Sequence, residues 1–233
     1  MQKQIVAMGG GGFLMEPDNP RLDDFVLGLA RGADSRVCLL PTAAGDSDRM
    51  LALFYTWLGP RCKATHLALF NRRVDDVDAF LRAQDVIYVG GGNTANLLAV
   101  WRVHGVDAAL RRAYESGVVL AGVSAGALCW FSGGVTDSFG ALGQLDDGLA
   151  FVDGTMCPHY DGEAARRPTF HALVALGMPA GYAADDGCAL HFVDGALREA
   201  VSSRPAARAY RVKRAPDGAV VETPLPTRHL AAR

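Results

Sequence analysis

Residues 118–130 read VVLAGVSAGALCW, and this stretch decides the fold. Its first three residues form the short apolar run typical of a buried strand in a parallel sheet, and its last four are compatible with the start of a helix. Between them Gly122, Ser124 and Gly126 match G-x-S-x-G, the pattern of a nucleophilic serine at a tight strand-to-helix turn. The alternative is an ordinary tight turn that contains a serine by chance.

The overall composition predicts one globular domain over residues 1–233. Half of the 233 residues (50%) are hydrophobic, which is enough for a sizeable core. The net charge of -2 and the pI of about 6.3 give no basic surface for nucleic acid. Neither a nucleic-acid nor a membrane partner is therefore expected, and a homodimer is one candidate oligomeric state.

The cysteines and the apolar runs predict a cytoplasmic protein without a metal site. The five cysteines never show C-x-x-C spacing, so neither a zinc site nor a disulfide framework is expected. Only four apolar residues in a row precede Gly9, too few for a signal peptide, and no apolar run approaches the ~20 residues of a membrane span. Residues 9–12 fail the dinucleotide pattern G-x-G-x-x-G because Leu14 stands in place of the last glycine, and no cofactor is predicted.

Strand and helix patterns alternate through the first half of the chain. The predicted fold class is therefore α/β, with a mostly parallel sheet flanked by helices on both faces. In such a fold, ligands bind beyond the carboxyl ends of the strands, so the loops after Met8, Leu40, Val89 and Val123 should share one rim. Strands are expected at 4–8, 37–40, 65–70 and 86–89, and helices at 22–30, 48–58, 74–82, 95–103 and 106–116.

The second half of the chain predicts late strands and a hairpin. A helix is expected at 169–176, and the segment around Pro216, Asp217 and Gly218 has the composition of a hairpin turn between residues 209–214 and 219–222. The tail after Pro224 is expected to be extended. The late strands are expected at 149–152, 155–157, 182–184 and 189–193.

A serine nucleophile needs a base, and His159 is the strongest candidate among six histidines. His159 follows a predicted strand and a proline, so it lies in a loop at a strand end, where catalytic residues are common. The alternative is a solvated turn histidine. The other histidines, including His171 and His191, lie within predicted helices or strands or in the tail, and we interpret them as structural.

The acid that would orient this histidine has several candidates. Asp185 and Asp186 interrupt two apolar runs, and because alternate strand residues face opposite sides, at most one of them can serve. A carboxylate between Ser124 and His159 would instead give the Ser, Asp, His order of α/β-hydrolases. The rival carboxylates in that interval are Asp137, Asp146, Asp147 and Asp153.

Four motifs together resemble peptidase family S51, which contains the aspartyl dipeptidases (peptidase E) and, more distantly, the cyanophycinases. The resemblance spans roughly residues 5–193 and implies a fold like that of the class I glutamine amidotransferases, with serine in place of the usual cysteine. The motifs are IYVGGGNT (87–94), GVSAGA (122–127), CPHY (157–160) and ADDGCAL (184–190).

The resemblance also implies roles for individual residues. Ser124 falls at the nucleophile, His159 at the general base and Asp186 at the orienting acid, while the N–H groups of Gly92 and Ala125 fall at the oxyanion hole. Asn93 is expected to bind the substrate's amino terminus or backbone, or simply to cap the following helix.

Substrate preference is less well defined by the motifs. In the aspartyl-specific members an arginine follows Gly-Glu after the histidine, but Ala165 stands at that position here and Arg166 comes one residue later. A shift of one residue near a helix start turns a side chain by ~100°. Arg166 is thus the candidate substrate-binding cation, Arg167 is the neighbour that could replace it, and both also fit a solvated helix start. We favour a broader aminopeptidase over strict aspartyl specificity.

The sequence therefore predicts a serine exopeptidase that hydrolyses short peptides from the amino-terminal end. The alternatives are an inactive binding module on the same fold and a cyanophycinase-like hydrolase. A glutaminase is disfavoured because Cys129 lies five residues beyond Ser124 on the predicted helix and cannot replace it as nucleophile.

Overall fold

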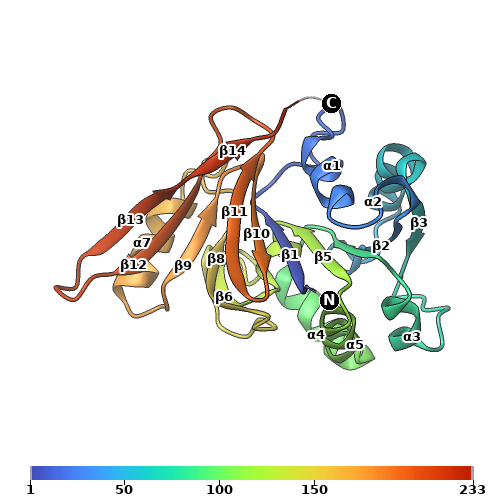
Figure 1. Cartoon of the computed structure of the whole chain (residues 1–233). Coiled ribbons are helices and arrows are strands. Elements are labelled where there is room, and N and C mark those ends of the chain that lie inside the picture. Colours follow the sequence, from blue (N-terminus) through green and yellow to red (C-terminus); the bar gives the residue numbers. More distant parts are fainter. Residues whose placement is uncertain (1, 232–233) are drawn as a thin grey trace.

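The computed structural model describes residues 2–231, which form two sheets with helices around them (Figure 1). The larger sheet has eight strands in the order β14-β11-β10-β1-β5-β4-β2-β3. The strands from β1 to β3 in this order are mutually parallel, as expected. They are β1 (Gln4–Met8), β5 (Val119–Val123), β4 (Val86–Val89), β2 (Arg36–Leu40) and β3 (Lys63–His66).

Helices cover both faces of this sheet because both faces are apolar, as the residues of β1 illustrate. Ile5 and Ala7 face one apolar core, whereas Val6 and Met8 face the other, because alternate strand residues point to opposite sides. In Figure 1, α4 and α5 lie on one side of β1 and β5, and α1 lies on the other. The helices are α1 (Arg21–Gly28), α2 (Asp48–Leu53), α3 (Val77–Arg82), α4 (Thr94–His104), α5 (Val106–Glu115), α6 (Ala125–Leu128) and α7 (Arg166–Ala175).

The second half of the chain builds more sheet than the sequence predicts. Beyond β1, the large sheet continues with the antiparallel β10 (Cys188–Val193), then β11 (Ala196–Ser202) and β14 (Thr227–His229). The tail after Pro224 is thus partly paired, since β14 runs parallel to β11.

A second sheet of six strands has the order β13-β12-β9-β8-β6-β7. Helix α7 packs on it through Phe170 and Val174, which share an apolar cluster with Val135 and Val212. The expected hairpin is present as β12 and β13. The strands are β6 (Phe131–Thr136), β7 (Gly143–Leu145), β8 (Val152–Cys157), β9 (Gly181–Ala184), β12 (Ala209–Arg214) and β13 (Val220–Leu225).

Several predicted bounds were wrong for local reasons. The helix expected at 48–58 is α only to Leu53 and continues as one π-helical turn over Phe54–Leu58. The helix expected at 74–82 begins at Val77, because the Asp76 carboxylate caps it by accepting a hydrogen bond from the Ala79 N–H (2.9 Å). The strand expected at 65–70 is at 63–66, and those expected at 149–152 and 155–157 are the single strand β8.

A buried acid on α1 gives this fold a pH-dependent stability. Asp23 is 1% exposed, with one carboxylate oxygen 3.4 Å from the Tyr88 hydroxyl. Burial raises the pKa of Asp23 from 3.8 to about 7, against the opposing charge of Arg61. Because the folded-state pKa lies above the unfolded one, the folded state binds more protons between these two values. The free energy of unfolding therefore falls as pH rises from about 4 to about 7.

We expect Asp23→Asn to stabilise the protein at neutral and alkaline pH. The amide keeps an oxygen that accepts from Tyr88 but cannot ionise. Its advantage over wild type should grow by up to about 1.4 kcal/mol per pH unit between pH 4 and 7 and then level off. Urea unfolding of both proteins at pH 5, 6, 7 and 8 measures this difference. An advantage that stays constant across this range would show that Asp23 does not titrate as described.

Candidate active site

Ser124 lies at a strained turn between β5 and α6. Its φ of 57° and ψ of -115° belong to a conformation that residues other than glycine rarely adopt. The turn is held in place because the Ser124 N–H donates to the Met8 carbonyl (3.1 Å). The Ser124 carbonyl accepts from the N–H groups of Ala127 and Leu128 (both 2.9 Å). The serine is thus fixed at the carboxyl edge of the parallel strands, where the sequence predicted it.

The two glycines of the motif are required by close backbone contacts. A Cβ atom on Gly122 would lie 2.0 Å from the Gly126 carbonyl oxygen, and one on Gly126 would lie 2.3 Å from the Val89 carbonyl oxygen. Neither position can therefore hold a side chain without moving the backbone. The turn is built around the serine, which argues against a chance match to the pattern.

His159 and Asp186 form a hydrogen-bonded pair. The loop between β8 and α7 holds His159 at a φ of 53°, and its N–H donates to the Gly9 carbonyl (3.2 Å). The His159 Nδ1 lies 2.7 Å from the Asp186 Oδ1, and both side chains are largely buried. This hydrogen bond holds the pKa of Asp186 below its usual value, although burial opposes the shift. Asp186 is therefore ionised at neutral pH.

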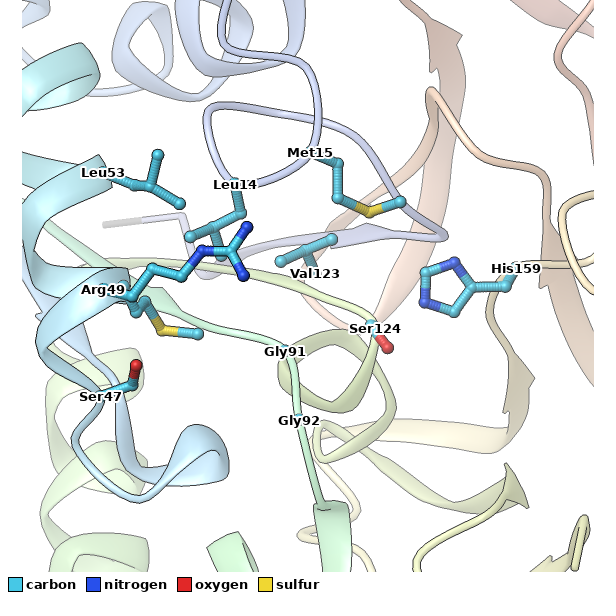
Figure 2. A pocket seen from close by; sticks show the side chains of 11 residues that line it. Leu14, Met15, Ser47, Arg49, Leu53, Gly91, Gly92, Val123, Ser124 and His159 are labelled. Atoms are coloured by element: carbon cyan, nitrogen blue, oxygen red, sulfur yellow. The ribbon is translucent and has the colours of Figure 1, made fainter.

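The Nε2 side of the histidine is left for Ser124. Since Asp186 engages Nδ1, the other ring nitrogen can accept a proton. Figure 2 shows the His159 ring with this edge turned toward the Ser124 side chain. Both residues line one cavity, but within residues 2–231 the Ser124 hydroxyl makes no hydrogen bond. Hydrogen bonds between a catalytic nucleophile and its base are often long or poorly aligned until substrate binds.

Two glycines whose role the sequence analysis missed make room for this pair. A Cβ atom on Gly10 would lie 2.0 Å from the Asp186 Oδ1 and 3.1 Å from the His159 Nδ1. A Cβ atom on Gly162 would lie 2.4 Å from the Asp186 Oδ2. The sequence analysis placed the loop after Met8 on the ligand-binding rim but gave its glycines no contact with His159 or Asp186. The position of this loop at the end of a parallel strand was the signal for a place near the site, whereas the contacts that require glycine depend on the folded loop.

The two amides predicted for an oxyanion hole flank the serine. A Cβ on Gly91 would lie 3.3 Å from the Ser124 Cβ, so the loop after β4 touches the nucleophile position. Gly92 has a φ of 140° and packs against the Ala43 carbonyl. Within residues 2–231, the N–H groups of Gly92 and Ala125 donate to no other protein atom. Both are thus available to an oxygen of a bound substrate.

The cavity beside Ser124 measures about 360 Å³, near the lower end for small-ligand sites. Ser124, His159 and the glycines 91 and 92 lie at one end. Ser47 and Arg49 lie at the other end, on α2 and just before it (Figure 2). The other lining residues are apolar, namely Leu14, Met15, Met50, Leu53 and Val123. The sequence analysis identified none of these wall residues, nor Ser47 or Arg49.

The rival acids lie elsewhere. Asp137 and Asp147 are exposed and pair with Arg166 (3.9 Å) and Arg102, respectively. Asp185 is buried, and its carboxylate accepts from the Arg208 N–H (2.8 Å), while burial raises its pKa to about 6. Asp146 and Asp153 are exposed. The structure brings Asp186 to His159 and none of these five.

The residues expected to bind substrate are engaged elsewhere. The Asn93 side chain accepts from the Asn96 N–H (2.8 Å) and donates to the Ser138 carbonyl (3.0 Å), so it acts as the cap of α4. The Arg166 side chain is buried against Glu163 (2.8 Å) and the Val135 carbonyl (3.1 Å), and Arg167 pairs with Glu222. None of the three lines the cavity, so the substrate contacts predicted for Asn93 and Arg166 find no support.

Within residues 2–231, no group of three or more His, Cys, Asp or Glu side chains is arranged to hold a metal ion. None of the helices in that range combines the length and apolar character needed to cross a membrane.

Comparison with known proteins identifies the class of enzyme to which this site belongs. The profile of peptidase family S51 matches residues 5–200. The chain belongs to this family of serine peptidases.

Individual relatives agree with this assignment. The uncharacterized peptidase YgaJ of Bacillus subtilis (strain 168) is 51% identical over 230 residues, which cover 98% of this chain and 99% of the relative. A peptidase from an acI-B1 actinobacterium has the same fold, with a TM-score of 0.70 at 17% identity over 97% of this chain and 95% of its own. A candidate peptidase E from Listeria monocytogenes EGD-e gives a TM-score of 0.61 at 18% identity, over 97% of this chain and 100% of its own.

Proposed function

We propose that this protein is a serine exopeptidase that hydrolyses short peptides from the amino-terminal end. The observation that carries the proposal is the shared cavity. Ser124 stands on a strained turn and lines this cavity with His159, whose Nδ1 is held by Asp186 at 2.7 Å. A nucleophile, a base and an orienting acid are the groups that peptide hydrolysis through an acyl-enzyme requires.

In the proposed reaction, Ser124 Oγ attacks the scissile carbonyl carbon while His159 Nε2 takes its proton. The oxygen of the tetrahedral intermediate accepts from the free N–H groups of Gly92 and Ala125. As the C–N bond breaks, the imidazolium returns the proton to the leaving amine. Water then attacks the acyl-enzyme in the same way, with His159 as its base, and Ser124 is regenerated.

Asp186 has an electrostatic role in this scheme. Its ionised carboxylate fixes His159 in the tautomer with the proton on Nδ1 and stabilises the imidazolium that forms during attack. The Asp161 carboxylate, which accepts from the Asp186 N–H (2.7 Å), holds the acid-bearing turn in place.

The size and apolar wall of the cavity support small substrates of mixed side-chain type. A cavity of about 360 Å³ holds only a few residues of a peptide. The apolar wall suits aliphatic side chains. We therefore propose a broad aminopeptidase specificity in preference to strict aspartyl specificity. A cytoplasmic location and a homodimeric state stay predictions.

A small peptide panel tests the exopeptidase proposal. The purified protein is incubated with Ala-Leu, Leu-Leu, Met-Leu and Asp-Leu, with their N-acetyl forms and with matching tripeptides, and products are identified by mass spectrometry. We expect the peptides with a free amino group to be cleaved at least about tenfold faster than the N-acetyl forms, because an exopeptidase acting at the amino end requires that end to be free. Equal cleavage of the blocked forms would rule out an exopeptidase, and no cleavage of any peptide would rule out the function.

A further inference from the structure

Arg49 is a cation on the lining of the cavity for which the mechanism has no use, and its side chain is partly open to solvent. It lies in the first turn of α2, and Figure 2 shows its guanidinium group extending over the cavity toward Val123 rather than away from it. Within residues 2–231, Arg49 makes no salt bridge and no side-chain hydrogen bond. Its donors are therefore available to a ligand.

The cavity lining contains basic side chains but no acidic one. Among the residues that line it, the ionisable side chains are Arg49 and His159, and no carboxylate is present. The acids next to Arg49 in the sequence face a different hollow, which they share with His66 and Phe70. One of them, Asp46, accepts a hydrogen bond from the Phe70 N–H (2.8 Å). A bound anion would therefore meet Arg49 without competition from a neighbouring acid.

The surroundings of Arg49 would strengthen its contact with an anion. Most of the side chains that line the cavity with Arg49 are apolar, so a substrate that fills the cavity displaces the water on that side of the guanidinium group. An ion pair that is weak in open solvent gains strength when water is excluded. Ser47, at the same end, offers a hydroxyl as a second donor.

We propose that Arg49 binds a carboxylate of the peptide substrate in the cavity that it lines together with Ser124. The guanidinium fork matches the two oxygens of a carboxylate. This inference rests on the proposed peptidase function. The carboxylate has two possible sources, the side chain of an acidic residue or the free carboxyl terminus of a short peptide. If Arg49 binds the terminal carboxylate, the fixed positions of Arg49 and Ser124 would select peptides by their length.

Binding to a variant that cannot react tests the role of Arg49 apart from catalysis. The Ser124→Ala protein is titrated calorimetrically with two pairs, Ala-Leu against Ala-Leu amide and Asp-Leu against Asn-Leu. In each pair only one carboxylate differs. We expect at least about a tenfold preference for the charged member of one pair, and that pair identifies the source. In the Ser124→Ala/Arg49→Gln protein the preference should fall to about one, whereas Arg49→Lys should retain part of it.

A matched control removes the same charge elsewhere. Arg72 is exposed and does not line the cavity, so Ser124→Ala/Arg72→Gln should keep the full preference. The inference is overturned if neither carboxylate matters, if the preference survives Arg49→Gln, or if none of the four peptides binds. Cleavage by the wild-type protein is scored separately. Peptides that bind through Arg49 but are never cleaved would contradict the proposed function alone, and peptides cleaved without carboxylate dependence would contradict this inference alone.

Discussion

Replacing Ser124 by alanine should reduce peptide turnover by about 10⁴- to 10⁶-fold, the usual cost of losing a triad nucleophile. The substitution removes only the attacking oxygen. The amides of Gly92 and Ala125 and the hydrogen bond between His159 and Asp186 stay in place, so the residual rate reports what they contribute without the nucleophile. Cleavage of a free dipeptide, followed by mass spectrometry at high enzyme concentration, measures both rates.

The Ser124→Ala protein should also fold like the wild type, which makes the loss interpretable. Within residues 2–231 the hydroxyl makes no hydrogen bond, so its removal leaves no buried partner unpaired. The strained backbone is held by contacts of the Ser124 N–H and carbonyl, which alanine retains. Thermal unfolding within about 2 °C of wild type is expected. Activity within tenfold of wild type would place the nucleophile elsewhere.

The centre of the parallel sheet was predictable because its strands, such as β4 and β5, are buried on both faces. Such strands read as short apolar runs, and Val86–Val89 matches its prediction at both ends. The turn at Ser124 was predictable because close backbone contacts require glycine at 122 and 126. These are strong local constraints, and they leave a clear pattern in the sequence.

The late strands were harder to predict from the sequence because their hydrophobic patterns are weak. β6 contains Gly133 and Gly134, which normally disfavour strands, yet both are needed where the backbone passes close to Leu145 and Met156. β11 is buried only over its last three residues, and its first half mixes exposed and partly buried positions. Such strands depend on partners that are distant in sequence, which a local pattern cannot reveal.

The site was predictable where chemistry demands a residue type and less so where only position matters. Ser124, His159 and Asp186 belong to motifs, whereas Arg49 is one arginine on a short helix and has no motif around it. It reaches the cavity because α2 follows β2, one of the parallel strands whose carboxyl ends form the rim. Arg166 shows the opposite case, since it is close to a family motif but its side chain is turned to Glu163.

Asp186→Asn should lower turnover by about 10⁴-fold while leaving the fold intact. In the wild-type protein the Asp186 carboxylate accepts from the His159 Nδ1–H at 2.7 Å. An asparagine can turn its NH₂ group toward that nitrogen, which stabilises the tautomer with the proton on Nε2. The histidine then faces Ser124 with a donor instead of an acceptor and cannot take the serine proton. Because an orienting acid acts through the base, the remaining activity should rise with pH as hydroxide replaces the missing base.

Asp137→Asn is the matched control for this change. Asp137 has a side chain that is 60% exposed and lies 3.9 Å from Arg166, so its neutralisation should leave turnover nearly unchanged. Rates for both variants are measured between pH 6 and 9, with circular dichroism to verify folding. A fully active Asp186→Asn protein beside an inactive Asp137→Asn protein would transfer the orienting role to the segment between Ser124 and His159. The order of the three residues would then be that of the α/β-hydrolases, and the hydrogen bond to Asp186 would serve only to hold the His159 loop.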